Sequence, residues 1–225
     1  MPPEGPAALS ALGVSRETEG LLSAFVERLR HWQTATNLVS KASLAEVWTR
    51  HVADSAQLVA LFPSGRRWLD LGSGAGFPGL VIAAMLASKP DAVVHLVESD
   101  RRKAAFIATV VRELSLPAVV HVERIESVVK RWSEPLDFVS ARALAPLDRL
   151  CDFLEPLVSD ATRAVLPKGA NFSVELEAAA HRWDIDLIRW PSLIDSSGSI
   201  IEIRRISRAT GTATRRARSD DPPGR

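Results

Sequence analysis

The sequence predicts an α/β fold in which a doubly wound parallel sheet follows an N-terminal helical segment. Apolar residues make up 46% of the 225 residues, which is enough for a sizeable core. Two helical patterns come first, and after residue 63 short apolar runs alternate with helical patterns, as in repeated βαβ units. We therefore expect a flexible lead-in over 1–15, a helical segment over 16–63 packed on the core, the α/β domain over 64–206 and a disordered Arg-rich tail over 207–225.

The helical segment is predicted from apolar side chains three or four positions apart. One such series runs from residue 21 to 32 and a second from 44 to 62. Pro63, Ser64 and Gly65 break the second pattern. The lead-in contains three prolines and two glycines, and we expect it to be loosely ordered.

The α/β domain is predicted from the alternation of strand and helix patterns. Because helices separate the first five strands, those strands should be parallel, whereas the last two have no helix between them and should be antiparallel. The predicted strands are 68–71, 93–98, 119–122, 138–140, 162–166, 185–190 and 200–206, and the predicted helices are 78–87, 101–114, 125–132 and 147–157.

The charge of the chain is balanced overall but uneven along its length. Lys and Arg total 28 against 27 Asp and Glu, so a purely electrostatic nucleic-acid binder is not expected. Residues 204–225 contain seven Arg and two Asp, which leaves 21 basic and 25 acidic residues before them. The body is therefore mildly acidic and the tail basic.

Cysteine content and hydropathy suggest where the protein works. The single cysteine, Cys151, cannot form an intramolecular disulfide or a thiolate cluster, and we expect no metal site. The longest apolar run, 80–87, is far shorter than the roughly 20 residues of a membrane helix. With no basic and apolar leader at its start, the chain is expected to be a soluble cytoplasmic protein without a membrane partner.

A glycine-rich loop between the first predicted strand and its helix is the strongest local signal. Asp70 closes the strand, and Gly72, Gly74 and Gly76 follow at alternate positions. Glycines allow a sharp turn and a close approach to a ligand at the start of a helix. Glu98 ends the next strand, where an acid that binds a ribose belongs. The pattern predicts a nucleoside cofactor site.

Two cofactors fit this loop. Gly74-x-Gly76-x-x-Gly79 matches the dinucleotide fingerprint, and an NAD-dependent oxidoreductase is one alternative. S-adenosylmethionine is favoured by Asp70, because a carboxylate attracts its ammonium and sulfonium groups but repels a pyrophosphate. The chain also has no tyrosine for a catalytic Tyr-Lys pair. We therefore predict S-adenosylmethionine.

Six ordered motifs resemble one known family. They are Asn37-Leu38-Val39-Ser40, Arg50-His51-x-x-Asp54-Ser55, the loop from Asp70 to Gly79, Arg124-Ile125-Glu126, Ser140-Ala141-Arg142-Ala143 and Lys168-Gly169. In order and spacing they are similar to the RsmG family, also called GidB, over about residues 15–206. The resemblance implies a class I, Rossmann-like, S-adenosylmethionine-dependent methyltransferase fold. The implied activity is methylation of N7 of a single guanosine in bacterial 16S rRNA of the small ribosomal subunit.

The resemblance also implies site residues. The methyl donor should lie against Gly72 and Phe77, and Glu98 should bind the ribose hydroxyls. The adenosine end should meet Ile125, Glu126 and Arg142. The complete set of expected cofactor residues is Asp70, Gly72, Gly74, Gly76, Phe77, Glu98, Ile125, Glu126 and Arg142, and the expected RNA-binding residues are Asn37, His51, Arg142 and Lys168.

Alternatives remain for two of the expected RNA contacts. His51 lies on the apolar stripe of the second helix, so it can instead be a core histidine beside an ion pair between Arg50 and Asp54. Asn37 follows the first helix and either turns the connection or lines the mouth of the cofactor site.

The residue types present favour guanine N7 as the acceptor. Cys151 lies in a predicted amphipathic helix without the Pro-Cys context of pyrimidine C5 methylation, and no Asn/Asp-Pro-Pro-Tyr/Phe loop for amine methylation occurs. Guanine N7 has an in-plane lone pair and no proton, so positioning suffices and no catalytic residue is assigned. We expect a monomer that acts on 16S rRNA in the small subunit or an assembly intermediate. A non-catalytic nucleotide-sensing or ribosome-binding module is the remaining alternative.

Overall fold

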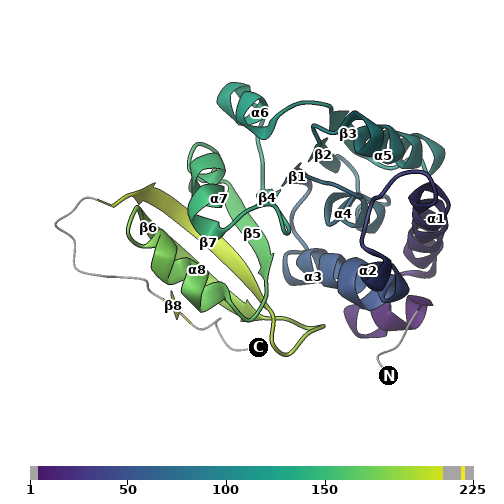
Figure 1. Cartoon of the computed structure of the whole chain (residues 1–225), viewed down its shortest axis with the longest axis horizontal. Coiled ribbons are helices and arrows are strands. Elements are labelled where there is room, and N and C mark those ends of the chain that lie inside the picture. Colours follow the sequence, from purple (N-terminus) through teal and green to yellow (C-terminus); the bar gives the residue numbers. More distant parts are fainter. Residues whose placement is uncertain (1–4, 210–218, 221–225) are drawn as a thin grey trace.

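One eight-stranded mixed sheet organises the computed structural model, which describes residues 5–209 and 219–220 (Figure 1). The strand order is β3-β2-β1-β4-β5-β7-β6-β8. β1 to β5 are parallel, and β7 runs antiparallel to both β5 and β6. The strands are β1 Arg67–Leu71, β2 Val93–Val97, β3 Ala118–His121, β4 Phe138–Ser140, β5 Arg163–Lys168, β6 Trp183–Pro191, β7 Ser199–Arg208 and β8 Ser219–Asp220. The predicted doubly wound sheet with an antiparallel final pair is confirmed.

Helices cover both faces of the sheet, as the pattern of buried residues shows. Successive residues of β1 enter different cores: Trp68 packs with the N-terminal helices, α4 and α5, whereas Leu69 packs with α6, α7 and α8. This alternation is what a strand buried on both faces requires. The helices are α1 Arg16–Gln33, α2 Lys41–Ala45, α3 Asp54–Leu61, α4 Gly79–Met85, α5 Arg101–Glu113, α6 Ile125–Arg131, α7 Leu147–Leu154 and α8 Phe172–Ala179.

The second predicted helix is interrupted. Instead of one helix over 44–62, the chain forms α2, a π-helical turn η2 over Trp48–Ala53, and then α3. π-Helical turns are rare in proteins. Those that do occur are often found at functional sites. Here the carbonyl of Arg50 accepts a hydrogen bond from Arg142 Nη1 at 2.8 Å. The interruption therefore coincides with a tertiary contact.

Three other segments differ from expectation. Residues Gly5–Leu12 form a 3-10 helix, η1, and Leu9 is fully buried in the core, so the lead-in is more ordered there than its prolines suggested. α8 was not predicted, because only Phe172 and Ala179 of its residues are buried and its apolar stripe is weak. Of the predicted tail, residues 207–208 belong to β7 and 219–220 form β8. Ala209 is described outside any strand, and residues 210–218 and 221–225 lie outside the described residues.

Candidate functional site

The glycine loop after β1 crosses the carboxyl ends of the first two strands. Gly72, Gly74 and Gly76 have φ of 71°, 57° and 90°, a region that other residues rarely adopt. The amide of Gly74 donates to Glu98 Oε2 at 2.8 Å, and Glu98 Oε1 accepts from the amide of Asp100 at 2.7 Å. One carboxylate at the end of β2 therefore holds both this loop and the start of α5.

Asp70, near the end of β1, supports the glycine loop through buried hydrogen bonds. Its side chain is fully buried, Oδ2 accepts from the amide of Gly79 at 3.2 Å, and Oδ1 accepts from Ser140 Oγ at 2.8 Å. Burial raises the pKa of Asp70 to about 6, against hydrogen bonds from Ser73, Ser140 and Gly79 that favour the charged form. Asp70 therefore supports the loop and is not among the residues that line the cavity beside it, and its contact with a cofactor stays a prediction.

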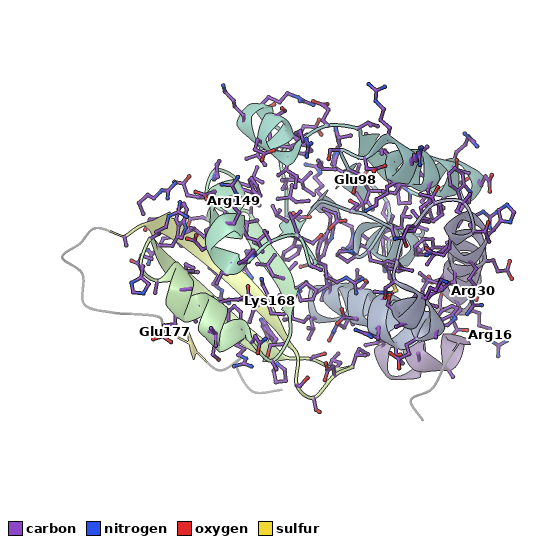
Figure 2. The ribbon with its side chains drawn as sticks, viewed as in Figure 1. Arg16, Arg30, Glu98, Arg149, Lys168 and Glu177 are labelled. Atoms are coloured by element: carbon purple, nitrogen blue, oxygen red, sulfur yellow. The ribbon has the colours of Figure 1, made fainter. Side chains whose placement is uncertain are left out.

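A cavity of about 570 Å³ lies above this loop, within the size range of small-molecule sites. Glu98, which directly follows β2, and Arg149 of α7 line this cavity, and both are labelled in Figure 2. Gly76 is not among the lining residues, and a side chain there would collide with Leu80. Seven of the nine expected cofactor residues line the cavity: Gly72, Gly74, Phe77, Glu98, Ile125, Glu126 and Arg142.

The residues of this cavity fit S-adenosylmethionine. The positive φ of Gly72 favours glycine there, and a Cβ would also lie 2.7 Å from Leu144 Cδ1 on the opposite wall. Glu98 and Glu126 supply acceptors for hydroxyl groups, and Ile125 and Phe153 supply apolar surface for a base. Sequence reasoning missed Lys103 and Arg149, which reach the cavity from α5 and α7, since neither lies in a recognisable motif.

A second, larger cavity of about 1,100 Å³ adjoins the first. It is bounded by η2, the segment 141–146, the end of β5 with the residues that follow it, and the loop 192–199. Residues 142–145 line both cavities and form the wall between them. Ala143 in this wall has φ of 50°, which is uncommon for a residue other than glycine. The two cavities are thus neighbours across one short segment.

Arg142 is held at this wall by groups from the N-terminal helices. Besides the Arg50 carbonyl, its Nη1 donates to Asp54 Oδ2 at 3.2 Å, and its Nη2 donates to His51 Nδ1. Its guanidinium lies 5.3 Å from the centre of the Phe77 ring, and the His51 ring stacks on the same phenyl ring at 4.9 Å. We call Arg142 with its three acceptors the arginine clamp.

The contacts of the arginine clamp contradict both parts of the alternative given for His51, the core histidine and the ion pair between Arg50 and Asp54. Asp54 pairs with Arg142, and Arg50 lies 3.5 Å from Glu46, so the expected pair of Arg50 with Asp54 is wrong. His51 is not a satisfied core histidine: its ring lines the larger cavity, and its Nε2 is buried without a hydrogen-bond partner in the described structure. The motif marked these residues as part of the site, but their spacing did not indicate which groups they contact.

Burial sets the charge states in the clamp. It lowers the pKa of His51 to about 3, and the positive charges of Arg142 and Arg50 act in the same direction. Burial also raises the pKa of Asp54 from its ordinary value, while Arg142 opposes that change. His51 is accordingly a neutral imidazole at physiological pH.

The other two expected RNA-binding residues, Lys168 and Asn37, are not part of the arginine clamp. Lys168, labelled in Figure 2, lines the larger cavity and forms an ion pair with Glu175 at 2.7 Å. Asn37 is exposed, accepts a hydrogen bond from Gln33 and lines neither cavity. The structure therefore brings His51, Arg142 and Lys168 around one cavity and leaves Asn37 outside it.

Comparison with known proteins identifies the fold and the family of this chain. Solved structures with a similar fold include the O-methyltransferase TomG from Streptomyces achromogenes in complex with SAM, with a TM-score of 0.56 and 15% identity over 88% of this chain and 95% of that one. An O-methyltransferase from Bacillus cereus in complex with SAH has the same TM-score and 14% identity, over 88% of this chain and 96% of that one. These similarities confirm the class I methyltransferase fold. Within the described residues, no helix could span a membrane.

Relatives in sequence are much closer. Ribosomal RNA small subunit methyltransferase G of Parvibaculum lavamentivorans is 48% identical over 211 residues, which cover 93% of both chains. The protein of the same name from Bradyrhizobium diazoefficiens is 47% identical over 205 residues, 90% of this chain and 77% of that one. The family model described as rRNA small subunit methyltransferase G matches residues 18–197. This chain therefore belongs to the rRNA small subunit methyltransferase G family.

Proposed function

We propose that this chain transfers the methyl group of S-adenosylmethionine to N7 of a single guanosine in the 16S rRNA of the small ribosomal subunit. The observation that carries the proposal is the pair of adjoining cavities, which share the wall formed by residues 142–145. A donor in one cavity and an acceptor in the other would lie next to each other at this segment. Family membership favours a methyltransferase over an NAD-dependent oxidoreductase.

We assign the smaller cavity to the cofactor. S-adenosylmethionine supplies an electrophilic methyl group on a positively charged sulfur. Glu98 would accept from the ribose hydroxyls while it keeps its hydrogen bond with the amide of Gly74. Ile125 and Phe153 line the cavity and would pack on the base, and Gly72 and Phe77 would border the donor end. Asp70 acts indirectly, because it holds the amide of Gly79 and so the shape of the loop.

We assign the larger cavity to the acceptor. Guanine N7 carries no proton, so the chain needs to hold the base in line with the methyl group rather than remove a proton. The lining residues match this requirement. Arg142 and Lys168 are each paired with a carboxylate, and we assign them to binding oxygen atoms of the RNA. Acidic side chains outnumber basic ones among the described lining residues, which favours the cationic 7-methylguanine product.

The substrate particle and the oligomeric state follow as parts of the proposal. The described body contains no extended basic run, so recognition should depend on the shape of the RNA in a small subunit or assembly intermediate more than on bulk charge. We propose that the chain acts as a monomer.

The decisive experiment is transfer of labelled methyl from S-adenosylmethionine to small subunits purified from cells that lack this protein. The modified nucleoside is then identified by mass spectrometry. Glu98→Ala should abolish transfer, because it removes the acceptor of the Gly74 amide, whereas Glu177→Ala on the exposed surface of α8 is the matched control.

The possible outcomes separate the candidate functions. Label recovered as 7-methylguanosine at one position supports cofactor, acceptor and substrate together. Binding of S-adenosylmethionine in calorimetry without transfer to any ribosomal particle would favour a sensing or ribosome-binding module. No binding at all would refute the proposal.

A further inference from the structure

We infer that His51 is a positioning residue that acts through Arg142: its Nδ1 accepts from the guanidinium and holds it at the wall between the two cavities. This inference rests on the proposed function, since it assigns a role in methyl transfer. It revises the expectation that His51 contacts RNA directly. The observations that carry it are the arginine clamp, the tautomer that the clamp requires and the place of Arg142 in both cavities.

The clamp determines which nitrogen of His51 carries the proton. Arginine has five N–H donors and no acceptor, so His51 Nδ1 must be the unprotonated nitrogen that accepts from Arg142 Nη2. The proton of the neutral ring is therefore on Nε2, which has no partner among the described residues. A protonated ring would have no acceptor left and would place a second positive charge beside Arg142.

The clamp leaves part of the guanidinium available. The Arg50 carbonyl and Asp54 use the two N–H groups of Nη1, and His51 uses one N–H of Nη2. Nε–H and the second N–H of Nη2 have no partner in the described part of the chain. Because Arg142 lines both cavities, these two donors can reach oxygen atoms of a donor or an acceptor molecule.

All three acceptors of the clamp come from η2 and the first residue of α3, far from Arg142 in the sequence. The π-helical turn presents the Arg50 carbonyl and the His51 ring on the same side as Asp54, and the ring rests against Phe77 of the glycine loop. The N-terminal helices thereby complete the site between the cavities. Loss of the His51 contact should leave the guanidinium on two acceptors and free to tilt.

Two substitutions distinguish action through Arg142 from direct contact of Nε2 with the acceptor base. In His51→Asn the side-chain oxygen can take the place of Nδ1 and still accept from Arg142, whereas in His51→Gln the amide reaches the place of Nε2. We expect His51→Gln to lower kcat about 100-fold, as misplacement of a positioning group can do, with little change in KM. His51→Asn should stay within about threefold of the wild-type kcat.

A double-mutant cycle with Arg142→Met tests the route of the effect. If His51 acts through Arg142, adding His51→Gln to Arg142→Met should cause almost no further loss of kcat, so the two effects are strongly non-additive. Calorimetric affinity for S-adenosylmethionine and the melting temperature of each variant are measured alongside. Rescue by His51→Gln but not by His51→Asn, or additive effects in the cycle, would overturn the inference.

A second readout does not depend on catalysis or on the folding of any variant. A long-range ¹H–¹⁵N correlation spectrum of the wild-type chain reports which nitrogen of His51 is protonated, and we expect the Nε2–H form. The Nδ1–H form, or a charged ring at pH 7, would refute the clamp. If the wild type binds S-adenosylmethionine but methylates no small subunit, the proposed function fails, while this spectrum still decides the state of His51.

Discussion

Replacing Asp70 by asparagine should remove a pH-dependent destabilisation of the folded chain, which arises because a charged carboxylate is buried. Asp70 is fully buried, and burial raises its pKa from 3.8 to about 6. A change of this size corresponds to about 3 kcal/mol of unfavourable free energy for the charged form in the folded state. Asparagine can keep both contacts, because its oxygen can accept from the Gly79 amide and its NH₂ can donate to Ser140 Oγ.

The sign of the effect follows from proton binding. Between about pH 4 and pH 6 the folded chain keeps a proton on Asp70 that the unfolded chain has lost, so this group makes the free energy of unfolding fall as pH rises through that window. His51 acts in the opposite direction: its pKa of about 3 makes the free energy of unfolding rise between about pH 3 and 6.5. The wild-type curve alone therefore cannot isolate Asp70.

The assay compares two chains at each pH. Urea unfolding is followed by tryptophan fluorescence from pH 4 to pH 8, since Trp68 is fully buried and reports on the core. The free energy of unfolding of Asp70→Asn minus that of the wild type should increase by about 2.5 kcal/mol between pH 4 and pH 7, because part of the change has already occurred below pH 4. Asp184→Asn, at an exposed position of β6, controls for the change of charge. A difference for Asp70→Asn that stays constant within about 1 kcal/mol would refute the reasoning.

Three further outcomes follow from the structure. Gly79→Ala should lower the free energy of unfolding by about 1–3 kcal/mol, because its Cβ would lie 2.1 Å from Leu96 Cδ2; Leu96→Val in the same chain should recover part of the loss in urea titrations. Burial raises the pKa of Cys151 to about 12, so a thiol reagent at pH 8 should label the protein rapidly only in denaturant. Lys168→Met should raise KM for small subunits about tenfold, with unchanged calorimetric affinity for S-adenosylmethionine; equal changes in both would place Lys168 at the cofactor instead.

Much of the fold could be predicted because its signals are local. Apolar periodicity located β1, α5 and β4 to within a residue, and the spacing of strands and helices predicted a parallel sheet. The apolar series over 21–32 lies within α1 but begins five residues after its start. α8 and η1 escaped prediction because their apolar stripes are short or weak, and they are stabilised by contacts with distant parts of the core. The π-helical turn could not be predicted, since its pattern differs little from that of a regular helix.

The functional site likewise has features that the sequence predicts and features that only the tertiary structure shows. The sequence by itself determined the glycine loop, Glu98 at the end of β2 and membership of the family, because these features depend on residues close together in the chain or on ordered motifs. Only the tertiary structure decided that Asp70 supports the loop, that Asp54 pairs with Arg142, and that His51 accepts from the same guanidinium. The physical reason is that burial and long-range hydrogen bonds arise only when the sheet and the N-terminal helices pack. Residues about 90 positions apart then become neighbours, and their charge states are set by that packing.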